Sequence, residues 1–167
     1  MNLDIFQALP DESPLWVYGF ETALDREKKE ILERKLTAFL PHWETHGSPV
    51  RGVFEIFEDR FLILSGHAPG GISGCAVDSS VRVFKQLREE GLDGLERSRV
   101  YFRAEDGSIQ AIHFTAFQPA IDEGRVVAST PVFDTNLGSL GQLRQAGFEK
   151  PFGESWHARA FSLPESI

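Results

Sequence analysis

The sequence has one cysteine and no long apolar run, and each shortage argues against a class of protein. One cysteine among 167 residues cannot form an internal disulfide bond, which agrees with a reducing compartment. No apolar run approaches the ~20 residues that a membrane-spanning helix needs, so we expect no membrane insertion. The opening residues 1–10, MNLDIFQALP, have neither a basic start nor an apolar stretch. We therefore expect no secretion signal and a cytoplasmic location.

Positive charge is also scarce. Asp and Glu number 25 against 17 for Lys and Arg, which gives a formal net charge of −8. Proteins that bind nucleic acid usually carry a basic surface that displaces counterions from phosphates, so we expect no nucleic-acid partner. The apolar share of 41% and the aromatic share of 11% are enough for a packed core, which excludes a disordered chain. The length predicts a single domain over residues 1–167.

The order of elements in the first hundred residues predicts an α+β fold. In chain order we expect a strand at 15–21, a helix from a cap at Thr22 to about His42, strands at 50–57 and 61–64, a helix from Asp78 or Ser79 to Glu90, and a strand at 99–105. This βαββαβ order, over about residues 15–104, is ferredoxin-like. It describes an antiparallel sheet with two helices on one face.

The remaining third of the chain predicts a hairpin, a short helix and a tail. Asp106-Gly107 favours a type I′ turn between strands at 99–105 and 108–114. The other expected elements are weaker strands at 126–128 and 131–133, a short helix through Leu137, Leu140 and Leu143 that is capped by Asp134 or Thr135 and ended by Gly147, and an extended tail at 156–161.

Cys75 is the candidate catalytic residue. It lies in SGCAVDSSV (73–81), after a glycine-rich loop and close to an expected helix start. A thiol near the free N–H groups of a helix N-terminus can have a lowered pKa and act as a nucleophile. His157 is the candidate base, with His113 and His67 as alternatives. The other interpretation of Cys75 is a small buried residue that packs under the loop.

The glycine-rich loop is also a candidate anion site, because backbone N–H groups at a helix start bind anions. The candidate ligand-binding residues are Gly70, Gly71, Gly74, Asp78, Ser79 and Ser80, with Arg159 as a cation for an anionic substrate. The loop matches neither the nucleotide-binding pattern GxxxxGK[ST] nor GxGxxG, and the alternative is a plain strand-to-helix connection.

Two histidines have the spacing of metal ligands, but we expect neither a metal nor another cofactor. His42 and His46 are four residues apart and would share one helix face. Pro41 and Gly47 oppose a regular helix there, and no third ligand is indicated.

Five segments together resemble a family of small bacterial proteins. These are LWVY (15–18), HWETHG (42–47), SGCAVDSSV (73–81), TPVFDTNLGSLGQLR (130–144) and SWHARAF (155–161), and the likeness extends from about residue 3 to 161. Members are often labelled "ABC transporter ATPase", a label that the missing phosphate-binding lysine loop does not support. The resemblance implies a single-domain cytoplasmic protein without assigned catalytic residues.

Three functions follow as hypotheses. The first is a non-catalytic binding or interaction domain, as a homodimer or with another protein partner, because no complete set of catalytic residues is apparent. The second is a thiol-dependent or anion-binding enzyme that uses Cys75 with His157. The third is an ATPase that serves a transporter, which only the family label favours.

Overall fold

The computed structural model describes residues 1 and 3–164, which form two compact units. The first unit comprises Met1–Leu95 and Asn136–Ala146, and the second comprises Glu96–Thr135 and the chain from Gly147 onward. Each unit has its own antiparallel sheet with helices, so the expected α+β class is confirmed. The sequence predicted a single domain over residues 1–167. In the structure, contacts between residues group the chain into these two compact units.

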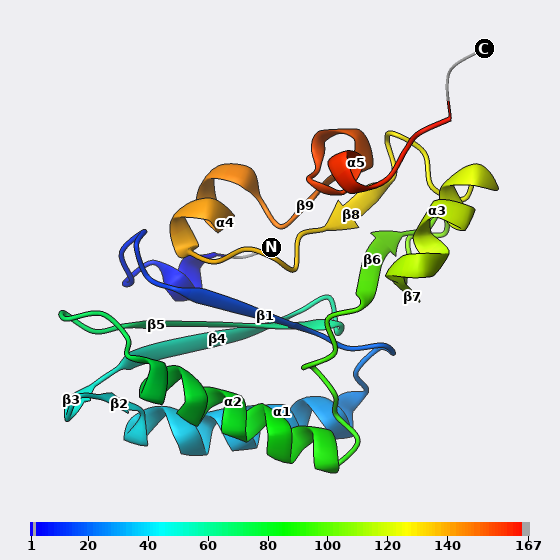
Figure 1. The fold of residues 1–167 in the computed structure, drawn as a ribbon. Coiled ribbons are helices and arrows are strands. Elements are labelled where there is room, and N and C mark those ends of the chain that lie inside the picture. Colours follow the sequence, from blue (N-terminus) through cyan, green and yellow to red (C-terminus); the bar gives the residue numbers. More distant parts are fainter. Residues whose placement is uncertain (2, 165–167) are drawn as a thin grey trace. The chain divides into compact units, whose positions relative to one another are not determined.

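The sheet of the first unit has three strands in the order β1-β5-β4 (Figure 1). They are β1 (Leu15–Gly19), β4 (Arg51–Phe57) and β5 (Phe61–His67). The hairpin β4–β5 is confirmed, and its turn places Glu58 and Asp59 at φ angles of 55° and 52°. Helices α1 (Arg26–Phe39) and α2 (Gly74–Glu89) cover one face of this sheet.

Helix α1 starts later than expected, because Asp25 rather than Thr22 is its cap. The Asp25 carboxylate accepts a hydrogen bond from the backbone N–H of Lys28 at 2.9 Å, which satisfies one of the free donors of the first turn. The helix gives way to a short 3₁₀ turn, η2 (Leu40–His42), where Pro41 lacks the N–H that an α-helix needs. A two-residue hairpin follows, formed by β2 (Glu44–Thr45) and β3 (Ser48–Pro49).

The N-terminal segment and α4 (Leu140–Ala146) lie on the other side of this sheet (Figure 1). The buried side chains from these segments are Phe6, Leu9, Leu137, Leu140 and Leu143. The Arg144 guanidinium donates to the backbone oxygens of Phe6 and Leu9, which ties the 3₁₀ turn η1 (Asp4–Phe6) to α4. The hydroxyl of Ser139 accepts from the N–H of Gln142, so Ser139 holds the cap position predicted for Asp134 or Thr135.

The first three strands of the predicted ferredoxin-like order form one sheet, and the fourth does not join it. The fourth expected strand, β6 (Arg99–Arg103), pairs instead with β7 (Ile109–His113) and β8 (Pro131–Phe133) in the second unit. At the start of β1, the outer edge is contacted by the chain that precedes α4. Leu15 donates its N–H to the Gly138 oxygen at 3.1 Å, and Leu140 donates to the Ser13 oxygen at 3.0 Å.

The sheet of the second unit has the order β7-β6-β8-β9. Its further elements are β7 (Ile109–His113), α3 (Phe114–Asp122), β8 (Pro131–Phe133), β9 (Glu149–Pro151), η3 (Phe152–Glu154) and α5 (His157–Ala160). The hairpin β6–β7 is confirmed, but its turn is not type I′, because Gly107 has a positive φ and Asp106 does not. A three-residue loop ending in a left-handed glycine suits this geometry.

Two other expectations for the second unit are wrong. Residues 126–128 do not form a strand, because helix α3 precedes them and the backbone of Val126 folds back to bond the Ala120 oxygen at 3.2 Å. The tail at 156–161 is not extended, because the Phe161 N–H donates to the His157 oxygen at 2.9 Å and closes a helical turn. Apolar side chains of α3, β6, β8 and η3 form the core of this unit.

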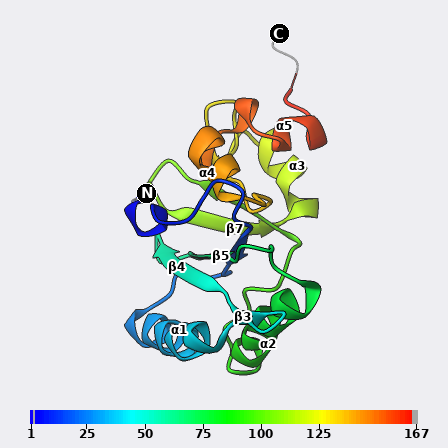
Figure 2. The ribbon, with the colours of Figure 1, turned by 90° about the vertical axis from the view of Figure 1, so that its left-hand side faces the viewer.

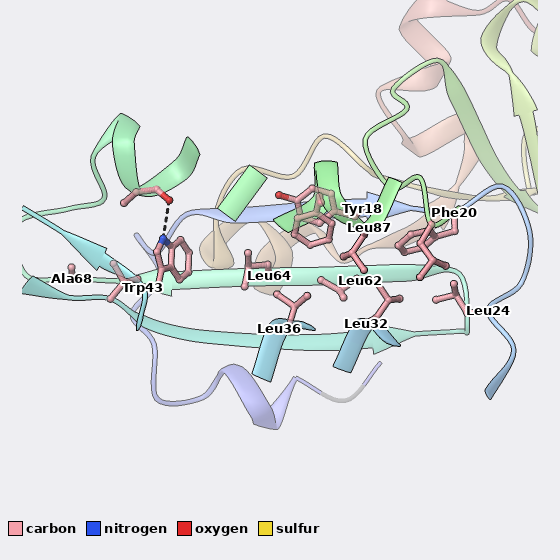
Figure 3. Close-up of a cluster of buried hydrophobic side chains, with 14 residues drawn as sticks. Tyr18, Phe20, Leu24, Leu32, Leu36, Trp43, Leu62, Leu64, Ala68 and Leu87 are labelled. Atoms are coloured by element: carbon pink, nitrogen blue, oxygen red, sulfur yellow. Dashed lines mark hydrogen bonds between the residues drawn. The ribbon is translucent and has the colours of Figure 1, made fainter. Parts of the chain in front are cut away.

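Trp43 belongs to the first unit's core and lies toward one end of it, near Ala68 (Figure 3). Its ring lies against two glycines, Gly52 and Gly66, which face each other across β4 and β5. A Cβ at Gly66 would lie 2.7 Å from the ring, which is closer than real carbon contacts allow. The indole N–H donates to the backbone oxygen of Ala76 at 2.8 Å, so the same side chain holds the first turn of α2 in place.

We predict that Gly66→Ala destabilises the protein by about 1–3 kcal/mol, because the added methyl overpacks the site against Trp43. Gly70→Ala is the matched control, since a Cβ there meets open space and the backbone φ is not positive. We expect the control to change stability by about 0.5 kcal/mol or less. Urea unfolding measures both, and equal effects would contradict this account of Trp43.

Candidate functional site

The glycine-rich loop ends at a helix start that differs from the prediction. Helix α2 begins at Gly74, with Ser73 as its cap, instead of at Asp78 or Ser79. The Ser73 hydroxyl accepts from the Ala76 N–H at 3.2 Å, and the Ser73 N–H donates to the Thr45 hydroxyl at 3.0 Å. The loop before α2 is therefore fixed to the β2–β3 hairpin.

The two candidate serines lie one turn inside α2 and direct their hydroxyls to its backbone. Ser79 donates to the Cys75 oxygen at 2.9 Å, and the buried Ser80 donates to the Val77 oxygen at 2.7 Å. Asp78 is exposed in the same turn. Among the candidate glycines, Gly71 has a φ of +82° and Gly70 and Gly74 face open space. Anion binding by this loop stays a prediction.

Cys75 is the second residue of α2, and its side chain is exposed. The interpretation as a small buried residue is therefore wrong, because α2 turns this position away from the core while the next residue, Ala76, is buried. The backbone N–H groups of a first turn point out of the helix start, where they stabilise negative charge. This position suits a reactive thiol, although no other described residue makes a hydrogen bond or ion pair with the Cys75 sulfur.

His157 lies in the second unit, whereas Cys75 lies in the first. The His157 ring is 2% exposed, with Nδ1 3.2 Å from the Ser155 hydroxyl. The Ser155 hydroxyl donates to the Phe152 oxygen, so it accepts from the ring, which therefore carries its proton on Nδ1. The Trp156 ring stacks on the imidazole with centroids 3.9 Å apart. Catalytic pairing of His157 with Cys75 stays a prediction.

The environment of His157 favours the neutral ring. Burial lowers the pKa of His157 to about 4, and the positive charge of Lys150 adds to this effect. The Asp134 carboxylate acts in the opposite direction, while it accepts a hydrogen bond from the Trp156 indole at 3.1 Å. Arg159 is exposed on the same four-residue helix, α5. A neutral ring locked in this way anchors the C-terminal segment.

The other two candidate bases have different surroundings. His113 is exposed at the cap of α3, where its Nδ1 accepts from the Thr115 N–H at 3.2 Å. His67 ends β5 opposite Arg51. His42 lies in η2 and His46 in the β2–β3 turn, and no three His, Cys, Asp or Glu side chains cluster as metal ligands anywhere in the described part of the chain.

Surface grooves also lie outside the predicted site, as two examples show. A groove of about 390 Å³ in the first unit runs along β4, and sequence reasoning missed it. Its lining residues are Ile5, Glu33, Thr37, Phe54, Glu55 and Ile56. A groove of about 530 Å³ in the second unit is lined by the β6–β7 turn and the turn after α3, with Glu105, Asp106, Gln110, Glu123 and Arg125. Arg125 forms an ion pair with Glu123 there.

The comparisons with known proteins leave the family open. The chain matches no protein-family model, no curated protein and no solved structure. No helix in the described residues is long and apolar enough to cross a membrane. The resemblance to proteins labelled "ABC transporter ATPase" therefore stays a prediction, and the fold and site are interpreted from this chain alone.

We predict that His157 makes the protein less stable in acid. The folded pKa of about 4 lies below the ordinary value of 6.5, so the unfolded chain binds more protons between these values. Stability from this residue is complete above pH 6.5 and is lost as the pH falls toward 4, by about 2 kcal/mol at pH 4.5. Urea unfolding at pH 7 and pH 4.5 measures the loss. His157→Gln is expected to show a smaller loss, and an unchanged pH dependence in this variant would contradict the prediction.

Proposed function

We propose that this chain is a non-catalytic protein-interaction domain that binds an extended segment along the outer edge of β4. The observation that carries the proposal is the position of β4 at the edge of its sheet. β4 is an outer strand of its sheet, and its seven residues keep an unbroken register with β5. Six of the seven are half-buried, whereas the central strand β5 is buried from Phe61 to Gly66.

The edge of β4 offers backbone groups to a partner. In an antiparallel ladder, alternate residues direct their N–H and C=O groups away from the neighbouring strand. Within the described residues, Gly52, Phe54 and Ile56 make no backbone hydrogen bond outside the β4–β5 ladder. A long apolar edge strand without a proline or bulge is a template for another strand.

Side chains beside β4 form the walls of its groove. Figure 2 shows β4 with α1 below it and the N-terminal segment above it. Ile5 of η1 is 47% exposed and lines the groove on one side, and Glu33 and Thr37 of α1 line it on the other. A strand added to β4 would pack its alternate side chains on these two walls.

The remaining sheet edges suit this role less well. The start of β1 is bonded to Gly138 and Leu140 by the contacts described above. In the second unit, the outer strands β7 and β9 have five and three residues. β4 is therefore the longest outer strand in the described part of the chain.

We predict that an uncharged strand peptide, a seven-residue Thr/Val repeat with an acetylated N-terminus and an amidated C-terminus, binds β4. Nuclear magnetic resonance titration of the full chain is expected to show shift changes at residues 51–57 and around Ile5. Ile5→Asp is expected to weaken binding about fivefold or more, because it places a charge on an apolar wall. Val127→Asp is the matched control, since Val127 is 48% exposed and lies in the second unit. Shift changes elsewhere, or none at all, would overturn the proposal.

A thiol-dependent enzyme is the second candidate function. The exposed position of Cys75 in the first turn of the 16-residue helix α2 favours it. In that function Cys75 is the nucleophile, His157 the base and Arg159 the group that holds an anionic substrate.

The enzyme hypothesis predicts that Cys75 is alkylated faster in the folded protein than in the unfolded chain at low pH. Backbone N–H groups of the first turn would stabilise negative charge on the attacking sulfur. Iodoacetamide alkylation from pH 5 to 10, followed by mass spectrometry, measures the two profiles, with Cys75→Ser as the blank. Coincident profiles would remove the nucleophile from the hypothesis.

A further inference from the structure

We infer that the segment bound by β4 is β4 of a second copy of this chain, paired antiparallel about a two-fold axis at Val53. This inference rests on the proposed function and names the partner. Such an interface uses one surface twice, so the strand must be complementary to itself. The sequence of β4, RGVFEIF, has this property.

The charges of β4 match in this register. With Val53 opposite its own counterpart, residues equally far before and after it face each other. Arg51 then lies opposite Glu55 of the second copy, and the two-fold axis repeats the pair. Neither side chain has an ion-pair partner among the described residues. Opposite charges in directly facing positions stabilise antiparallel pairs, and like charges destabilise them.

Neighbouring registers are less favourable. A two-fold axis at Glu55 sets two carboxylates against each other. An axis at Phe54 sets Glu55 against Val53 and leaves Arg51 opposite Phe57. An axis at Gly52 leaves Arg51 opposite Val53. The axis at Val53 is thus the one of these four that pairs both charges of the strand.

The other face of β4 also fits this pairing. Phe54 and Ile56 pack against the core on the side of α1 and α2, and Gly52 shares their face. Gly52 has no side chain because Trp43 and Leu40 fill its space. In the Val53 register it lies opposite Phe54 of the second copy, so the large ring faces a position that has no side chain.

The test exchanges the two charges. Sedimentation velocity of the wild-type chain from about 5 µM to about 500 µM is expected to show a monomer–dimer equilibrium, since a short strand pair is a small interface. Arg51→Glu and Glu55→Arg are each expected to weaken the dimer about tenfold or more, because each sets two like-charged pairs in the interface. A 1:1 mixture of the two variants is expected to restore it as a heterodimer, because every facing pair is then opposite in charge.

Recovery of the dimer in the 1:1 mixture, after its weakening in each variant alone, is expected for the Val53 register, in which residues 51 and 55 face each other. Other registers and long-range charge repulsion do not predict this recovery. The double variant Arg51→Glu/Glu55→Arg is expected to dimerise like the wild type. A wild-type chain that stays monomeric, or variants that dimerise unchanged, would overturn the inference. If the chain is monomeric and the Thr/Val peptide still binds β4, only the identity of the partner is wrong. If the peptide also fails to bind, the proposed function falls with it.

Discussion

The contact of Trp43 with two glycines is the constraint on which the first unit depends. Its ring fills the space that side chains at Gly52 and Gly66 would take, so both adjacent strands approach it closely. Its indole N–H is satisfied by the Ala76 oxygen inside the core, which avoids the cost of a buried unpaired donor. One side chain thus fixes the spacing between the sheet and the start of α2.

This arrangement also determines what the edge strand offers. Because Trp43 and Leu40 take the space beside Gly52, β4 has no side chain at this position. Phe54 and Ile56, which share the face of Gly52, pack against the core. The residues between them direct their side chains to the other face, since successive side chains of a strand alternate. Arg51 and Glu55 therefore share the face of β4 that points away from α1 and α2.

Local signals in the sequence predicted local structure well. The apolar runs at β1, β4 and β5 and the helix stop at Gly91 follow from patterns within a few residues, and the structure confirms them. The caps were harder to predict, because Thr22 and Asp25 are both good cap residues. In the structure the Leu24 N–H, between them, donates to the distant Asp59 oxygen, and Asp25 caps the helix. Helix α3, which contains Pro119, was not predicted from the sequence, and its buried residues Phe117, Ala120 and Ile121 pack into the second core.

Long-range pairing could not be predicted from the sequence. The order of elements made β6 the natural fourth strand of the first sheet, but strand order depends on contacts between distant segments, and β6 pairs with β7 and β8. The candidate site shows the same limit. The sequence identified Cys75 near a helix start, and the structure confirms that place, whereas burial of His157 and the groove along β4 required knowledge of what packs beside them.

Net charge limits how two copies of this chain can associate. A formal charge of −8 on each opposes contact at most relative orientations, since like-charged surfaces repel. Association then requires a local surface where positive charge meets negative and where backbone donors and acceptors are unpaired. β4 combines both conditions, because Arg51 and Glu55 lie four residues apart on one face of an open strand. That even spacing allows each charge to meet its opposite about a single two-fold axis, so the net charge opposes general association while Arg51 and Glu55 favour one register.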